Sequence, residues 1–193
     1  MSTKNLATGA SPRERLLAAA TELFYGEGIH TVGIDRVIEK AGVAKASLYS
    51  TFGSKDALVC AYLEGRQEAR KARVMKKLAT YDTPRARLLG VFDALHDYIG
   101  EPRFRGCAFL RASAEGRTER GVRDACEDAR AWTRALFTEL ATAAGARQPK
   151  RLAAELVLLY DGATVSAHMD DNREAALTAR AVAAALLDAA IAR

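Results

Sequence analysis

The sequence predicts an all-α fold of about nine helices. Long stretches lack the strict alternation of polar and apolar residues that strands need, and they repeat apolar residues at helical spacing instead. Only four prolines and fourteen glycines interrupt the 193 residues. A hydrophobic fraction of 49% is typical of a folded globular chain rather than a disordered one. The chain is long enough to bury a sizeable core.

The first helix is expected to begin at Pro12, with Ser11 as its N-cap, and to end near Gly26–Gly28. Residues 34–41 then form a short second helix, which Gly42 ends in the left-handed conformation. The remaining helices are expected over residues 44–51, 54–78, 82–98, 107–115, 119–144, 149–168 and 172–192.

Residues 34–51 therefore contain two short helices joined by a tight glycine turn, which is a helix-turn-helix. Helices this short are marginal alone in water, so neighbouring helices must supply apolar surface. Leu48 and Phe52 are four residues apart and are expected to face inward. The outward side of the second short helix is small and polar, with one cation and one phenol. It comprises Lys45, Ala46, Ser47, Tyr49, Ser50 and Thr51.

Such a surface suits double-stranded DNA. Small residues allow a helix to approach the floor of the major groove, and Ser, Thr and Ala contact base edges or thymine methyls. Tyr49 and Lys55 suit the flanking phosphates, which fix register rather than sequence. The helix that follows Ser54 adds backbone donors for the same phosphate.

Several elements at fixed spacing carry a family resemblance over residues 12–60. They are Phe24 and Gly28, the turn Ala41-Gly42-Val43, the pair Leu48-Tyr49, then Phe52 and Ser54-Lys55. At these positions the chain resembles the TetR family of bacterial transcriptional regulators. The resemblance implies a homodimer with an N-terminal helix-turn-helix and a larger helical domain that binds a small inducer. It also implies DNA contacts for Lys45, Ala46, Ser47, Tyr49 and Lys55.

The chain departs from the family pattern at four positions. Gly33 and Ala44 stand where Ser or Thr often caps the second and third helices. Ala46 replaces a frequent Gly, and Thr51 stands where His is common. These departures leave the helical fold intact and change the expected base and phosphate contacts.

The expected organisation is a flexible arm over residues 1–11, a DNA-binding domain over 12–57 and a regulatory and dimerisation domain over 58–193. The first residues lack the apolar core of a signal peptide, and no apolar run reaches membrane-spanning length. We therefore expect a cytoplasmic protein without membrane partners. Three cysteines, an odd and widely spaced set, argue against a disulfide framework.

The last two helices carry apolar or small-residue stripes that the resemblance places in a four-helix dimer interface. The predicted interface residues are Leu152, Leu156, Leu159, Ala163, Leu177, Ala181 and Ala184. The alternative is that these stripes form the core of a single chain.

A ligand pocket in a helical domain is expected among aromatic and polarisable side chains. The candidates are Phe92, His96, Phe104, Cys107, Phe109, Leu110, Trp132 and Tyr160. Ordinary core packing is the alternative for each of them. The mixture favours a moderately hydrophobic organic inducer.

The sequence thus predicts a DNA-binding regulator, a repressor released from a palindromic operator by a small molecule, rather than an enzyme. No metal-ligand spacing or catalytic motif occurs, so neither metal nor cofactor is expected. The net charge of +5 does not identify a nucleic-acid-binding face, because the first 60 residues carry seven Lys and Arg against six Asp and Glu. Residues 66–77, with six Lys and Arg, are interpreted as a solvated helix face or as a contact to flanking DNA.

Two alternatives remain. The first is a redox-sensing regulator of the same fold that acts through Cys107, if its thiol is exposed beside Arg103 or Arg105. The second is a helical small-molecule-binding protein whose helix-turn-helix is vestigial.

Overall fold

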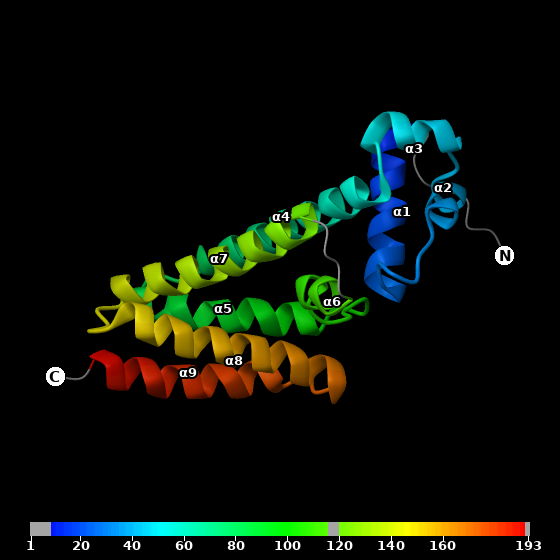
Figure 1. Cartoon of the computed structure of the whole chain (residues 1–193). Helices are drawn as coiled ribbons and strands as arrows, with labels where there is room; N and C mark the ends of the chain where they lie inside the picture. The colour runs from blue at the N-terminus through cyan, green and yellow to red at the C-terminus, as the bar shows by residue number, and fades with distance from the viewer. Residues whose placement is uncertain (1–8, 116–119, 192–193) are drawn as a thin grey trace. The chain divides into compact units, whose positions relative to one another are not determined.

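The structure, a computed structural model, describes residues 9–115 and 120–191, and within them it contains helices and no strands. The prediction of an all-α fold is therefore confirmed. Figure 1 labels the helices of this part of the chain. They are α1 (Pro12–Glu27), α2 (Ile34–Ala41), α3 (Lys45–Phe52), α4 (Lys55–Leu78), α5 (Pro84–Ile99), α6 (Ala108–Ala114), α7 (Arg120–Ala143), α8 (Pro149–Met169) and α9 (Ala175–Ile191).

The helix boundaries lie within a few residues of those expected from caps, glycines and prolines. Residues 1–8 of the predicted arm lie outside the described residues, as do residue 119 of the seventh expected helix and residue 192 of the last.

The chain divides into two compact units. The head unit comprises Met1–Arg66 and Ala108–Cys126, and the helical unit comprises Gln67–Cys107 and Glu127–Arg193. The chain therefore leaves the head unit within α4, returns to it for α6, and leaves it again within α7. The functional division into residues 12–57 and 58–193 stays a prediction, because compactness does not show which residues bind DNA.

In the head unit, α1 packs against both α2 and α3. Its N-terminus has a capping box, in which Ser11 Oγ accepts the Glu14 N–H and the Glu14 carboxylate accepts the Ser11 N–H. Val37 of α2 and Leu48 of α3 are completely buried. Burying one such side chain contributes about 1.5–3 kcal/mol, so α1 gives the two short helices the apolar surface that they lack alone.

The turn between α2 and α3 depends on Gly42. Its backbone adopts φ 62° and ψ 42°, the left-handed region that favours glycine, and its N–H caps the end of α2. The Arg15 side chain of α1 donates to the Gly42 carbonyl at 3.3 Å. The angle between the two short helices is therefore held by backbone geometry and by α1.

In the helical unit, α8 packs along α9, and α5 packs against both (Figure 1). Phe92 of α5, Phe137 of α7, Leu156 of α8 and Leu187 of α9 are all fully buried in one apolar core. Gly90 of α5 is needed for this packing, because a Cβ there would lie 2.5 Å from the ring of Tyr81.

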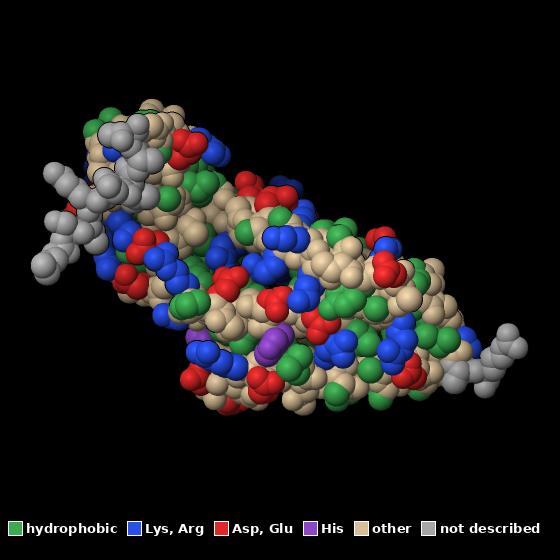
Figure 2. Space-filling view, turned by 180° about the vertical axis from the view of Figure 1, so that it is seen from behind, with side chains coloured by type: hydrophobic (Ala, Val, Ile, Leu, Met, Phe, Trp, Pro, Cys, Tyr) green, Lys and Arg blue, Asp and Glu red, His purple; other side chains and the backbone are tan. Residues whose placement is uncertain are grey.

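No helix of the described residues is both long and apolar enough to cross a membrane. On the face that Figure 2 shows, Lys and Arg side chains are interspersed with Asp and Glu side chains. Charge alone therefore does not mark this face as a DNA-binding surface.

Candidate nucleic-acid interface

Helix α3 has one buried face and one exposed face. Leu48 is 0% exposed and anchors the helix to the head unit, whereas Tyr49, the next residue, is 48% exposed. Lys45, Ala46 and Ser50 are also exposed. Their side chains are short or flexible, so the outer face presents little bulk to a DNA groove.

Ser47 and Thr51, the two other predicted α3 contacts, are half-buried. The Thr51 hydroxyl donates to the Ser47 carbonyl at 2.6 Å, and the Ser50 hydroxyl donates to the same carbonyl at 3.1 Å. Because both hydrogens are directed into the helix, the oxygens are left as acceptors. In this arrangement the hydroxyl oxygens of Ser50 and Thr51 can accept a hydrogen bond from a base, for example from the amino group of adenine or cytosine.

Lys45 has an acidic partner in α2. Its ammonium lies 2.8 Å from Asp35, and both side chains are well exposed. The hydrogen bond from Lys45 and the charge of Asp35 together raise the pKa of the Lys45 ammonium. The ammonium must leave Asp35, or share it, to contact a phosphate.

Lys55, at the first position of α4, is half-buried. Its ammonium donates to the Ile29 carbonyl at 2.8 Å and to the Val32 carbonyl at 2.5 Å. It also lies 5.9 Å from the centre of the Phe24 ring. These contacts hold the loop between α1 and α2, a structural role that the sequence did not reveal.

The basic stretch over residues 66–77 is less solvated than its sequence indicates. The Arg66 guanidinium lies 3.9 Å from the centre of the Tyr25 ring in the head unit. In the helical unit, Arg70 lies over Trp132 at 5.3 Å and Arg73 over Tyr98 at 3.9 Å. These cation–π contacts bind three of the six basic side chains to aromatic partners of their own chain.

The predicted ligand-binding residues fall into both units. Phe92, Trp132 and Tyr160 lie in the helical unit, and the Phe92 and Tyr160 rings are 6.3 Å apart between their centres. Phe104 packs edge-on against Tyr98 at 5.2 Å. His96 and Cys107, also in the helical unit, are half-buried, whereas Phe109 and Leu110 belong to α6 of the head unit. Their contribution to ligand binding stays a prediction.

Among the described residues of the helical unit, Gln67 Nε2 and His96 Nδ1 are buried polar atoms without a hydrogen-bond partner. Gln67 is only 8% exposed, and its Oε1 accepts from Arg70 at 2.7 Å, so its two amide hydrogens point elsewhere. A buried donor without an acceptor is destabilising by about 1–3 kcal/mol, which a bound acceptor group removes. Burial also raises the pKa of the Tyr160 hydroxyl above its ordinary value. Sequence reasoning missed Gln67, because glutamine is usually exposed.

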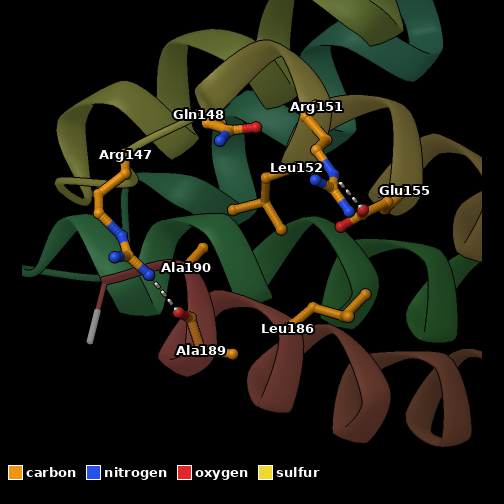
Figure 3. Close-up of a pocket in the computed structure, with 8 residues that line it drawn as sticks. All are labelled: Arg147, Gln148, Arg151, Leu152, Glu155, Leu186, Ala189 and Ala190. Carbon is orange, nitrogen blue, oxygen red and sulfur yellow. Dashed lines mark hydrogen bonds and ion pairs between the residues drawn. The ribbon is translucent and has the colours of Figure 1, made fainter. Parts of the chain in front are cut away.

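The structure contains a groove of about 430 Å³ where the start of α8 faces the end of α9 (Figure 3). Leu152, Leu186 and Ala190 form part of its lining. Arg151 pairs with Glu155 at 3.2 Å, and Arg147 donates to the Ala189 carbonyl at 3.4 Å. None of the eight predicted ligand-binding residues lines this groove.

Three of the predicted dimerisation residues lie in the chain's own core. Leu152, Leu156 and Ala163 are 2%, 0% and 6% exposed. A side chain that is already buried has no surface left for a partner, so the alternative of intrachain packing describes these three. Leu159 and Ala184 are half-buried, whereas Leu177 and Ala181 are exposed.

Other apolar side chains are better placed on the outside of these two helices. Leu158 of α8 is 69% exposed and Val182 of α9 is 45% exposed. The exposed surface of the pair therefore contains large apolar groups that the sequence pattern alone did not select.

The three cysteines, Cys60, Cys107 and Cys126, are half-buried and form no disulfide in the part of the chain that the structure describes. Burial, together with nearby carboxylates, raises the pKa of the Cys60 thiol. Cys126 donates weakly to the Phe109 carbonyl at 3.6 Å.

A glycine turn between two short helices, with small polar residues exposed on the second, defines a helix-turn-helix protein. Residues 16–62 match the family described as bacterial regulatory proteins, tetR family. A solved TetR-family transcriptional regulator from Streptomyces coelicolor is 32% identical, with a TM-score of 0.87 over 94% of this chain and 96% of that one. A solved tetr-transcriptional regulator from Streptomyces avermitilis is 34% identical, with a TM-score of 0.84 over 95% and 100%.

The chain belongs to the TetR family of bacterial transcriptional regulators. It is also 37% identical over 87 residues to the HTH-type transcriptional activator FasR of Mycolicibacterium smegmatis. That match covers 45% of this chain and 40% of the relative. The relatives are regulators rather than enzymes, and one of them activates transcription.

Proposed function

We propose that this chain is a homodimeric repressor that binds a palindromic operator through α3 and leaves it when a small, moderately hydrophobic molecule binds the helical unit. The observation that carries the proposal is the division of α3 between buried Leu48 and an exposed face with Tyr49, Lys45, Ala46 and Ser50. The exposed residues are of the types that read a groove and contact phosphates. Such a protein works in the cytoplasm, where the DNA lies.

Dimerisation follows from the geometry of DNA. Two recognition helices reach two half-sites about 34–36 Å apart only if two head units are joined. The exposed apolar residues Leu158, Leu177 and Val182 supply the contact surface that we assign to this dimer. We assign the effector to the part of the helical unit around Gln67 and Trp132, because the unpaired Gln67 amide favours a ligand with a hydrogen-bond acceptor.

The first test is selection of bound fragments from a random DNA pool with the purified full chain. Enrichment of a palindrome with half-sites about one turn apart supports the proposal. No enrichment at low salt, from a protein that mass spectrometry shows to be free of small molecules, supports the vestigial alternative instead. A reporter gene under the selected operator then distinguishes repression from the activation named for the FasR relative.

Trp132 provides a direct test of the effector site. It is the chain's only tryptophan, and it lies under the Arg70 guanidinium. Candidate ligands that release the operator should change its fluorescence, and Gln67→Leu should weaken their binding about tenfold because one hydrogen bond is lost. Release that leaves the fluorescence unchanged would place the effector elsewhere.

The redox alternative has its own discriminating experiment. Oxidant should abolish operator binding by the native chain and not by Cys107→Ser if this thiol is the sensor. Equal binding with and without oxidant removes that alternative.

A further inference from the structure

The loop between α1 and α2 is held from two sides by groups of opposite charge. The carboxylate of Glu115, the residue that follows α6, accepts the N–H of Ile29 at 3.2 Å and the N–H of His30 at 2.5 Å. Lys55 donates to the carbonyls of Ile29 and Val32. Ile29 therefore gives its N–H to an anion and its carbonyl to a cation.

Helix α6 also contacts the end of α1. Arg111, one turn before Glu115, donates to the Tyr25 carbonyl at 2.6 Å, a group in the last turn of α1. A cation at a helix C-terminus is favourable, because the last carbonyls lack partners within the helix. Gly28 has φ 102°, and a Cβ there would lie 3.0 Å from Glu115 Oε1. Glycine at this position thus permits the close approach of the carboxylate.

This contact acts on the elements that would read DNA. The loop leads directly into α2, whose Val37 is fully buried, and α2 and α3 both pack against α1. A shift of the loop therefore shifts α2 and the recognition helix with it. The interaction is long-range in sequence, because Glu115 lies 85 residues beyond His30.

The two charged residues also lie on segments that connect the units. Lys55 begins α4, which continues past Arg66 into the helical unit, and the chain enters α6 from that unit at Cys107. The helical unit is therefore connected by the chain to both groups that bond the Ile29 backbone, to Lys55 through α4 and to Glu115 through α6.

We propose that Glu115 is a positioning residue for DNA binding. It holds the α1–α2 loop against Lys55, and this arrangement sets the orientation of α2 and α3. Lys55 acts in the same arrangement, through the loop rather than through a phosphate. The inference rests on the proposed DNA-binding function.

The sign of the effect distinguishes positioning from simple electrostatics. Removal of an acidic charge from a DNA-binding unit strengthens DNA binding when only long-range electrostatics changes. Loss of a positioning contact weakens operator binding instead. The salt dependence also separates the two, since it counts phosphate contacts and Glu115 makes none.

The experiment measures operator affinity of the full chain between 50 and 200 mM salt, a range over which phosphate contacts change affinity by orders of magnitude, about 10³–10⁵-fold for six to ten contacts. The variants are Glu115→Gln, Glu115→Ala and, as a matched control, Glu139→Gln at an exposed position of α7. Glu115→Ala should weaken operator binding about tenfold with an unchanged salt slope, a coupling of ordinary size. Glu115→Gln keeps one acceptor oxygen and should show a smaller loss, and the control should bind normally.

Lys55→Met completes the series. It should weaken operator binding without changing the salt slope, whereas loss of a phosphate contact would reduce that slope by about 0.9. A reduced slope for Lys55→Met, or unchanged or tighter binding by folded Glu115→Ala, would overturn the proposal.

Hydrogen exchange tests the contact without DNA. The amides of Ile29 and His30 should be protected in the native chain and should exchange faster in Glu115→Ala, while the amide of buried Val59 keeps its protection. Fast exchange of both loop amides in the native chain would refute the contact. If the native chain binds no DNA, the proposed function fails separately, because this exchange result still decides whether Glu115 holds the loop.

Discussion

At the level of single residues, Lys45, which we propose as a DNA contact, has an acidic partner in the free chain. Its ammonium is paired with Asp35 on the neighbouring helix, and both groups are exposed. An exposed ion pair of this kind contributes little to stability, so exchanging Asp35 for a phosphate as the partner of the ammonium costs little. Asp35 then competes with the phosphate for Lys45 and repels the DNA itself.

Two substitutions at this pair should have opposite effects. Lys45→Ala should weaken DNA binding and reduce the salt slope by about 0.9, because one phosphate contact is lost. Asp35→Asn should strengthen binding, because the competing carboxylate is removed. Fluorescence anisotropy with the selected operator at several salt concentrations measures both, and Lys150→Ala on α8 is the control. An unchanged slope for Lys45→Ala would place this residue away from DNA.

Tyr49 tests the assignment of α3 contacts in another way. Its 48% exposure beside fully buried Leu48 leaves the hydroxyl accessible. Tyr49→Phe should weaken binding to all sequences about tenfold, because it removes a hydrogen bond to a charged phosphate and no base contact. Binding to a set of operators with single base changes provides the measurement. A change of preference at one base position would instead make Tyr49 a reader of sequence.

At the level of helices, the two glycines that flank α2 have different requirements. Gly42 has φ +62°, whereas Gly33 has φ −75° and open space where a Cβ would lie. Gly42→Ala should lower the free energy of unfolding by about 1–2 kcal/mol, because an L-residue is strained in the left-handed region. Gly33→Ala, the matched control, should lower it less, since the extended backbone there suits any residue and only the N-cap preference for glycine over alanine is lost.

Urea denaturation, followed by circular dichroism, measures these differences. Operator affinity measured alongside should fall for Gly42→Ala, since the angle between α2 and α3 depends on this residue. Equal stability of the two variants would show that the turn relaxes without strain.

Helix boundaries were predictable because local signals specify them. The Ser11–Glu14 capping box, the left-handed Gly42 and the Ser54 cap each act within three or four residues. The contact of Glu115 with Ile29 was not predictable, because no periodicity links positions 86 residues apart.

Burial on a single chain was equally hard to assign. Leu156 and Leu158 are two residues apart on α8, yet one is 0% and the other 69% exposed. The sequence stripe selected Leu156 for the dimer, because apolar spacing alone does not distinguish a face toward the chain's own core from a face toward solvent. The same limitation applies to Lys55, whose neighbours in sequence do not show that carbonyls of a distant loop surround its ammonium.

At the level of the whole molecule, regulation is a coupling between two binding equilibria. A ligand that binds the DNA-free conformation 100-fold better shifts the balance by about 2.7 kcal/mol, and DNA weakens the ligand by the same factor. In the proposed dimer, one operator binds two head units at once, so dimerisation multiplies the effect. Disruption of the dimer should therefore impair DNA binding even when each head unit is intact.

Leu158→Glu is the substitution that tests this coupling. A charge at a 69% exposed position leaves the chain folded, but it cannot be buried in an apolar interface without a partner. We expect sedimentation to show dimers for the native chain and monomers for Leu158→Glu, with normal melting temperature and greatly reduced operator binding. Met75→Glu on α4, at a 54% exposed position, is the matched control and should stay dimeric. Dimers of Leu158→Glu would move the interface away from this face of α8, and a monomeric native chain that still binds a palindrome would require dimerisation on the DNA itself.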